Sequence, residues 1–241
     1  MFKDVSDSLL KFNAPLEGVV AWPYQDILGL VTVGIGCLIE PVGLALPLHW
    51  DGSPDAATIR QEWTRVNSLK PAMHFNQYKS ASSLRLTDSG VQDLLAHRAL
   101  DFEATLRKWF PDWDNWPADA QMAALGMSWA CGPAFPRTFT NFAHYANVRD
   151  WANAAKCAKI REQGNPGIVP RNKQIALCLA NAAAIDSPDG YATPALYWPG
   201  PVLDAPNPTG EQAEEAAAAL AAFSIEDCGL TGHCHELAQA A

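Results

Sequence analysis

Hydrophobic positions recur at helical spacing along most of the chain. The first such segment spans residues 4–17, and its apolar face carries Val5, Leu9, Phe12 and Leu16. This period predicts an amphipathic helix. Gly18 follows directly, and a glycine after the last periodic residue commonly ends a helix. The pattern therefore predicts a helix that ends with Glu17.

Residues 19–37 have a different character, because the segment is rich in β-branched and aromatic residues, with Gly29 mid-way and Gly34 and Gly36 later. This composition predicts a short hairpin or a small sheet. Asp26 and Thr32 lie at equal distances from Gly29, so a turn centred on Gly29 would set them opposite each other on one face of the ribbon. We expect Glu17, at the end of the preceding helix, to face the same surface across a gap.

The rest of the pattern predicts further helices. Residues 41–80 form an inserted or expanded lobe with one helix, for which Ser53 is the expected N-cap and Pro54 lies in the first turn. Thr87 is expected to cap a long helix, and another runs from Pro117 to Gly132. Later helices are expected at 138–146, 149–162 and 170–185. The predicted fold class is mainly α (α+β), with one small β element near the start.

Beyond residue 185 the composition changes to proline and glycine, which indicates an extended surface segment. An alanine-rich helix is expected at 211–223, followed by a tail rich in Cys and His. The predicted organisation is one folded domain over 1–185, which includes the lobe 41–80, and an appendage over 186–241.

Composition and charge exclude several classes of protein. The chain has 241 residues, is 49% hydrophobic and carries a formal net charge of −9. An acidic chain is unsuited to nucleic acid, which requires a basic surface. No apolar run approaches the roughly 18 residues of a membrane span. The N-terminus lacks the basic and apolar regions of a signal peptide, which predicts synthesis in the cytoplasm without one.

Six cysteines are scattered without a CxxC pair. Free thiols are the first interpretation for a chain without a signal peptide, and disulfides formed after delivery to an oxidising compartment are the alternative. Four tail residues have ligand chemistry that would suit zinc: Cys228, His233, Cys234 and His235. A tail disulfide or solvated thiols is the preferred interpretation of that group.

Glu17, Asp26 and Thr32 are the candidate chemical groups. Two carboxyl groups flanking a cleft, with a hydroxyl beside one of them, are the parts that glycoside hydrolysis needs. The apolar neighbours of Glu17 predict desolvation, which would raise its pKa and keep it protonated as an acid. Asp26, in a more open turn, would stay ionised. The structural alternative is a Glu at a helix end, an Asp in a turn and a Thr buried in a strand, each without catalytic function.

The spacing of these residues resembles that of the phage-type lysozymes, glycoside hydrolase family 24 of the lysozyme-like superfamily. The shared elements are Glu17-Gly18, Tyr24, Asp26, Gly29, Thr32 and Gly34-Ile35-Gly36. Three later segments are similar to the helices of that family, namely "LRLTDSGVQDLLAHRALDFEATLRKWF", "DAQMAALGMSWACGPAF" and "GIVPRNKQIALCL". The resemblance covers roughly residues 5–40 and 84–185.

The resemblance implies a two-lobed fold, with a β-hairpin lobe near the N-terminus and a helical C-terminal lobe. It implies a muramidase that cleaves the β-1,4 bond between N-acetylmuramic acid and N-acetylglucosamine, generally with inversion and with no metal or organic cofactor. Glu17 would be the general acid, Asp26 would orient or deprotonate water, and Thr32 would help to hold that water. The candidate substrate-binding residues are Trp22, Tyr24, Leu38, Trp129 and Arg171; packing or solvated roles remain open for the aromatic residues and Arg171.

The chain departs from the family pattern at three positions. Cys37 stands where the family often has a histidine, so a salt bridge that stiffens the small lobe is expected to be absent. Asn172 replaces the second of two arginines, and Ala130 replaces a polar residue. Cys37 as the nucleophile of an amidase is a further alternative, although a small packed residue is the simpler interpretation.

The expected target is the glycan strand of peptidoglycan, reached in the periplasm or on the cell wall after release or injection. A phage endolysin and an antibacterial effector of a type VI secretion apparatus both fit. The acidic charge and the extra segments favour the effector, for which a cognate immunity protein is expected. The rival hypothesis is a lysozyme-like module that binds glycan or a partner without cleaving.

Overall fold

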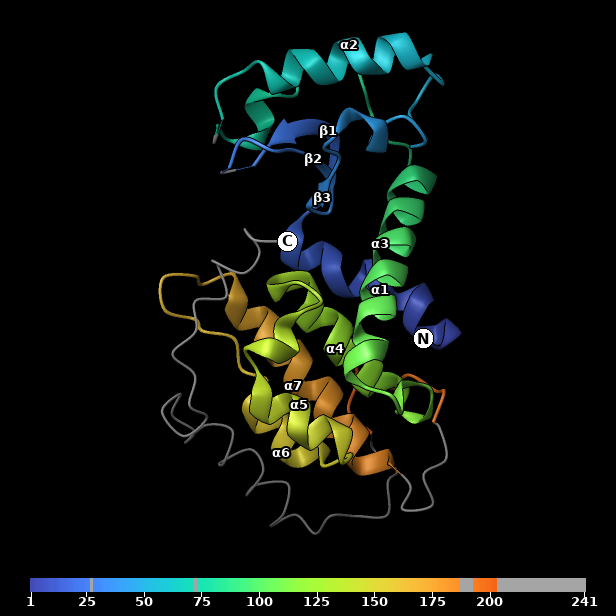
Figure 1. The fold of residues 1–241 in the computed structure, drawn as a ribbon, viewed down its shortest axis with the longest axis vertical. Helices are drawn as coiled ribbons and strands as arrows, with labels where there is room; N and C mark the ends of the chain where they lie inside the picture. Colours follow the sequence, from blue (N-terminus) through green and yellow to red (C-terminus); the bar gives the residue numbers. More distant parts are fainter. Residues whose placement is uncertain (27, 72, 187–192, 203–241) are drawn as a thin grey trace. The chain divides into compact units, whose positions relative to one another are not determined.

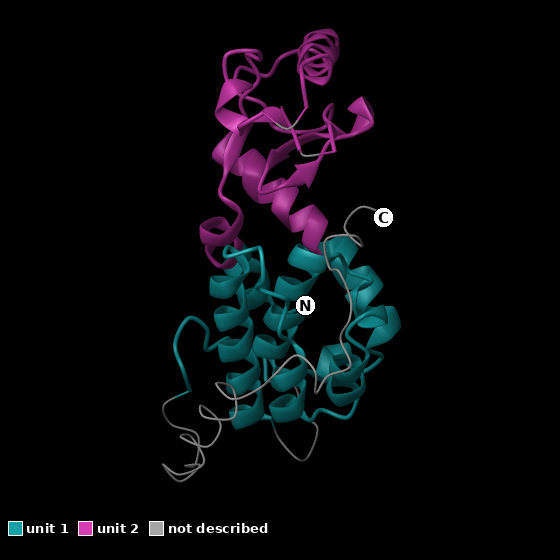
Figure 2. Ribbon diagram, turned by 90° about the vertical axis from the view of Figure 1, so that its left-hand side faces the viewer, with its two compact units in different colours: residues 1–9, 100–241 teal, residues 10–99 magenta. Residues whose placement is uncertain are grey.

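The computed structural model describes residues 1–26, 28–71, 73–186 and 193–202. These residues are mostly helical, with a small three-stranded antiparallel sheet, which confirms the prediction of a mainly α chain. They divide into two compact units (Figure 2): unit 1 contains residues 1–9 and 100–241, and unit 2 contains residues 10–99. Helices α1 (Lys3–Glu17) and α3 (Asp88–Trp109) contribute residues to both units.

Unit 2 is built around the sheet, whose strands β1 (Val20–Gln25), β2 (Val31–Gly34) and β3 (Cys37–Leu38) lie in sequence order. Helix α2 (Ala56–Asn67) packs against β1 and β2 (Figure 1). Two short 3-10 helices, η1 (Val42–Leu44) and η2 (Phe75–Gln77), flank α2 in sequence. The segment 41–80 thus helps to build the core, which includes Val31, Val33, Ile39, Ala45, Trp50, Ile59, Val66, Tyr78, Leu84, Leu86 and Val91.

The caps of two helices in unit 2 can be compared with the prediction. The prediction of Ser53 as the cap of α2 is wrong, because the Asp55 carboxylate accepts the Thr58 N–H at 2.8 Å. Aspartate and serine are comparable N-caps. Asp55 caps α2 because it directly precedes the first helical residue, Ala56, whereas Ser53 lies two residues earlier. Thr87 does cap α3, since its hydroxyl oxygen accepts the Gly90 N–H at 3.0 Å.

Unit 1 is organised around α4 (Ala118–Cys131), which is buried along nearly its whole length and packs against α7 (Ile168–Ile185). A helix that is apolar all round needs neighbours on every side. Helices α5 (Thr140–Asn147) and α6 (Trp151–Cys157) pack together, and α6 also packs against α7. A further 3-10 helix, η3 (Trp113–Asn115), precedes α4, and η4 (Phe135–Arg137) follows it. The largest fully buried aromatic residues here are Phe110, Trp113, Trp116, Phe135, Phe142 and Trp151.

The prediction of a helix over 149–162 is wrong in its length, because α6 ends at Cys157. The Asn172 amide, from α7, pairs with the backbone of Ile160 in both directions, at 3.0 and 2.7 Å. These hydrogen bonds satisfy backbone groups that a continued helix would otherwise have used.

Past the expected domain boundary at 185, residues 193–202 still pack on α4 and α7. The buried Asp119 carboxylate accepts hydrogen bonds from Asn181 Nδ2 and from the backbone N–H groups of Tyr197 and Trp198, at 2.9, 2.9 and 3.1 Å. The expected helix at 211–223 and the tail group Cys228, His233, Cys234 and His235 lie outside the described residues. Within the described ranges, no helix combines the length and apolar character of a membrane span.

Candidate active site in unit 2

The hairpin of unit 2 closes one residue earlier than the sequence pattern predicts. Tyr24 pairs with Thr32 and Gln25 with Val31, and the Asp26 N–H donates to the Leu30 carbonyl at 3.0 Å. The pairing is therefore centred on position 28, and the prediction that Asp26 lies opposite Thr32 is wrong. The reason is local: the Asp26 Oδ1 atom accepts the N–H groups of Leu28 and Leu30, at 2.8 and 2.9 Å, so Asp26 closes the turn itself.

Asp26 and Thr32 still belong to the same side of the ribbon. Tyr24 and Thr32 are directly opposed and so share a face, and Asp26 follows Tyr24 by two positions along the strand direction. A residue displaced by two from the direct partner is a diagonal neighbour on that face. The register therefore makes Thr32 the direct partner of Tyr24 and a diagonal neighbour of Asp26.

Glu17 ends α1 and lies beside the turn between β2 and β3. A Cβ atom placed on Gly36 would lie 3.9 Å from Glu17 Oε2, and Gly36 has a φ of 72°. The expectation that neighbouring apolar residues bury Glu17 is wrong, because Glu17 is exposed, as are Gly18 and Val19. The first residues after the helix run along the surface instead of folding over the carboxyl group.

Tyr24 connects the candidate groups. Burial, together with the nearby Cys37, Glu17 and Asp26 groups, raises the pKa of Tyr24 to about 12. Both carboxyl groups therefore lie within electrostatic reach of one phenol, which stays neutral at physiological pH. Thr32, the strand partner of Tyr24, is only 3% exposed, and its hydroxyl donates to the Leu30 carbonyl at 3.1 Å. The lone pairs of that hydroxyl are left to accept hydrogen bonds.

Cys37 does not have the environment of a nucleophile. Burial raises the pKa of the Cys37 thiol to about 11, against a smaller lowering by the Arg98 guanidinium and a further raising by Glu17. A thiol with this pKa is protonated near neutrality, whereas a nucleophilic cysteine must be a thiolate. Arg98, from α3, interacts with the thiol at the position where the sequence resemblance predicts a missing salt bridge.

The candidate substrate-binding residues fall in both units. Trp22, Tyr24 and Leu38 belong to unit 2 with the carboxyl groups, and Leu38 is 39% exposed on β3. Trp129 and Arg171 belong to unit 1. The Trp129 ring meets Phe102 edge to face at 5.3 Å. Arg171 is 2% exposed and donates to the Gly126 carbonyl at 3.0 Å, which ties α7 to α4.

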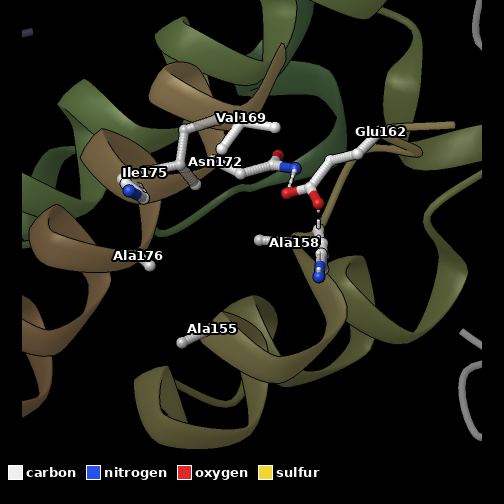
Figure 3. Close-up of a pocket in the computed structure, with 9 residues that line it drawn as sticks. Ala155, Ala158, Glu162, Val169, Asn172, Ile175 and Ala176 are labelled. Atoms are coloured by element: carbon white, nitrogen blue, oxygen red, sulfur yellow. Dashed lines mark hydrogen bonds and ion pairs between the residues drawn. The ribbon is translucent and has the colours of Figure 1, made fainter. Parts of the chain in front are cut away.

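Unit 1 contains a pocket of about 430 Å³ between α6 and α7 (Figure 3). Its walls are mostly small apolar side chains, and Glu162 is the one carboxylate among the residues that line it. The Asn172 amide donates to Glu162 at 3.0 Å, so this carboxylate takes part in the bracing of α7. A single carboxylate that is already engaged in this way does not provide an acid and base pair.

Sequence reasoning missed two residues around the site, Arg98 and Phe75. Both are distant in sequence from residues 17–38, and neither belongs to a local motif. Within the described ranges, no group of three or more His, Cys, Asp and Glu side chains is placed to hold a metal ion. Comparison of the chain with protein-family models and with curated proteins finds no match.

Proposed function

We propose that the chain is a muramidase that hydrolyses the β-1,4 bond between N-acetylmuramic acid and N-acetylglucosamine in peptidoglycan. The observation that supports this best is that Thr32 pairs with Tyr24 in the sheet of unit 2 and that Glu17 and Asp26 both lie within electrostatic reach of Tyr24. The spacing of the same residues resembles that of the phage-type lysozymes. Glycoside hydrolysis by acid and base requires a pair of carboxyl groups, and Glu17 and Asp26 both belong to unit 2.

In this mechanism Glu17 acts as the general acid. Its exposed position at the end of α1 leaves the carboxyl group open to a glycan strand. It donates its proton to the glycosidic oxygen as the bond to that oxygen breaks, so the leaving sugar departs as a neutral alcohol. Positive charge develops on the anomeric carbon at the same time.

Asp26 and Thr32 together bind the attacking water. Asp26 Oδ1 is held by two backbone N–H groups, and the mechanism assigns the water to Oδ2. Because the Thr32 hydroxyl gives its own proton to the Leu30 carbonyl, it accepts one hydrogen of the water. Asp26 takes the other proton as the oxygen attacks from the face opposite the leaving group, which gives inversion.

The rival function is a module that binds glycan or a partner protein without cleaving it. Such a module would not need two carboxyl groups within electrostatic reach of Tyr24, the strand partner of Thr32. For the biological role, the inference from the sequence still applies: an antibacterial effector with a cognate immunity protein is preferred to a phage endolysin. A neighbouring immunity gene would support the effector, and a neighbouring holin gene the endolysin.

The test is muropeptide release from purified peptidoglycan by the wild type and by the Glu17→Gln variant. Glutamine preserves shape but cannot donate a proton as an acid, so we expect activity to fall at least about 10²-fold. Glu162→Gln is the matched control, because the amide oxygen can still accept from Asn172 and the position is outside the site. If the wild type releases no muropeptides, or if Glu17→Gln is as active as wild type, the proposed function is wrong.

A further inference from the structure

A cluster of aromatic rings lies next to the candidate active site, and part of it comes from the segment 41–80. Phe75, in η2, is 38% exposed. Its ring centre lies 6.3 Å from that of Trp22 and 6.5 Å from that of Tyr24. His74 stacks on Phe75 at 4.3 Å. Side chains of two segments about 50 positions apart in the sequence thus form one aromatic surface.

The backbone fixes this surface in place. The Trp22 indole N–H donates to the Phe75 carbonyl at 2.9 Å, which ties η2 to strand β1. The Tyr78 hydroxyl, one residue beyond η2, donates to the Lys70 carbonyl at 2.7 Å and closes the base of the loop. The exposed Phe75 ring is therefore presented by an anchored segment. Anchoring of this kind reduces the conformational entropy that binding would cost.

Two cations lie over the Trp22 ring. The Lys79 ammonium lies 4.8 Å from the centre of the Trp22 ring, and the Arg85 guanidinium carbon lies 5.6 Å from it. Arg85 donates to the carbonyls of Ser82 and Leu84, at 2.8 and 2.6 Å, so its guanidinium group stabilises the backbone of this loop. Lys79 is exposed, and it remains available to a ligand with negative charge.

The surface is continuous with the candidate active site through Tyr24. Tyr24 contacts Phe75 with its ring edge, pairs with Thr32 along the strand and lies within electrostatic reach of both carboxyl groups. A polymer bound with one bond at Glu17 and Asp26 would have its next sugars close to Phe75. A small-molecule substrate confined to the carboxyl groups would not use this surface.

We propose that Phe75, Trp22 and Lys79 form an additional binding subsite for the glycan strand, supplied largely by the segment 41–80. This inference rests on the proposed function. The apolar face of a pyranose ring packs on Phe75 and Trp22, as sugar rings do on aromatic side chains. Lys79 binds a carboxylate of the peptide that muramic acid carries. The subsite makes the chain prefer long, peptide-bearing glycan strands.

The first test compares turnover of intact peptidoglycan by Phe75→Ala, Phe75→Tyr and the wild type. We expect Phe75→Ala to raise KM about fivefold to tenfold, where tenfold corresponds to about 1.4 kcal/mol of lost contact, with kcat nearly unchanged. Phe75→Tyr keeps the ring and should keep the wild-type KM. The matched control is Leu44→Ala, because Leu44 is another exposed apolar residue of the same segment, at 49%. A Phe75→Ala variant with the KM of the wild type would overturn the proposal.

The second test addresses the charge. Lys79→Gln should weaken binding to intact peptidoglycan by up to about fivefold, because an exposed ion pair contributes about 0.2–1 kcal/mol. It should have no effect on binding to peptidoglycan whose carboxylates have been converted to neutral amides. Lys70→Gln, an exposed lysine of the same unit, is the control. Equal effects of Lys79→Gln on both substrates would contradict the assignment of Lys79 to the peptide carboxylate.

A binding measurement separates failure of this inference from failure of the proposed function. In the Glu17→Gln background, co-sedimentation with insoluble peptidoglycan reports binding without turnover. If the double variant Glu17→Gln/Phe75→Ala sediments less than Glu17→Gln alone, the subsite is supported even if the wild type proves to be inactive. If the wild type is active and Phe75→Ala changes neither KM nor sedimentation, the subsite is wrong and the muramidase proposal stands.

Discussion

Replacement of Asp26 by asparagine would separate the two tasks that the mechanism gives to its carboxylate. Oδ1 holds the turn by accepting the N–H groups of Leu28 and Leu30. An amide has one oxygen that accepts and one NH2 group that donates. The two backbone donors therefore select the orientation in which the amide oxygen takes the place of Oδ1. The NH2 group then faces the water and cannot accept its proton.

The size of each effect follows from these contacts. Asp26→Ala removes both hydrogen bonds of the turn, each worth about 0.5–1.5 kcal/mol, so the free energy of unfolding of unit 2 should fall by about 1–3 kcal/mol. Asp26→Asn keeps both bonds and should change it by less than about 0.5 kcal/mol, as surface substitutions commonly do. Loss of the general base should lower kcat about 10²–10⁴-fold in both variants. Asparagine thus removes activity without removing stability.

The assays are muropeptide release for activity and urea denaturation followed by tryptophan fluorescence for stability. Asp51→Asn is the control, since Asp51 is an exposed aspartate of the same unit. An Asp26→Asn variant that keeps more than about a tenth of wild-type activity would refute the assignment of the base, because the expected loss is larger. Equal stability of the Ala and Asn variants would refute the structural role of Oδ1.

Two further predictions concern stability and pH. Burial raises the pKa of the Cys37 thiol from 9.0 to about 11. The stability that the buried neutral thiol contributes is therefore complete below pH 9 and is lost as the pH rises to 11. Over that interval the urea midpoint of the wild type should fall more than that of Cys37→Ala. Burial also raises the pKa of Asp119 against the hydrogen bonds that it accepts. Its stabilising contribution is therefore complete below about pH 4, the ordinary value, and declines as pH rises through the raised pKa. The wild type should gain stability on acidification relative to Asp119→Asn, and parallel melting curves of the two proteins across that range would contradict this.

The errors in the sequence-based prediction have particular physical causes. Symmetry about Gly29 suggested the centre of the hairpin, but the Asp26 carboxylate bonded to Leu28 and Leu30 moves that centre by one position. Helix α6 ends early because Asn172 bonds to the backbone of Ile160. In the first case a side chain competes with the backbone pattern, and in the second the competing side chain comes from a distant helix. Periodicity contains neither kind of information.

The successes have causes of the same kind. Helix α1 was predictable because an apolar stripe and a glycine stop act locally, and Gly18 indeed adopts a φ of 72°. The candidate carboxyl groups could be proposed from the sequence because they lie within one short segment, and their catalytic role stays a prediction. Phe75 and Arg98 were missed because they reach this segment only through the folding of α2, η2 and α3. A residue that joins a site from a distant part of the chain cannot be identified from the local pattern of hydrophobic and polar residues.

The glycines of the Gly34-Ile35-Gly36 segment can be explained by packing alone, and this affects how strongly the resemblance supports catalysis. A Cβ on Gly34 would lie 3.1 Å from Leu94, and both glycines have positive φ values, 69° and 72°. Asp26 likewise has a structural reason, since it closes the turn. Glu17 is exposed at the end of α1, and its proposed role as the acid is the part of the motif that the Glu17→Gln variant tests most directly.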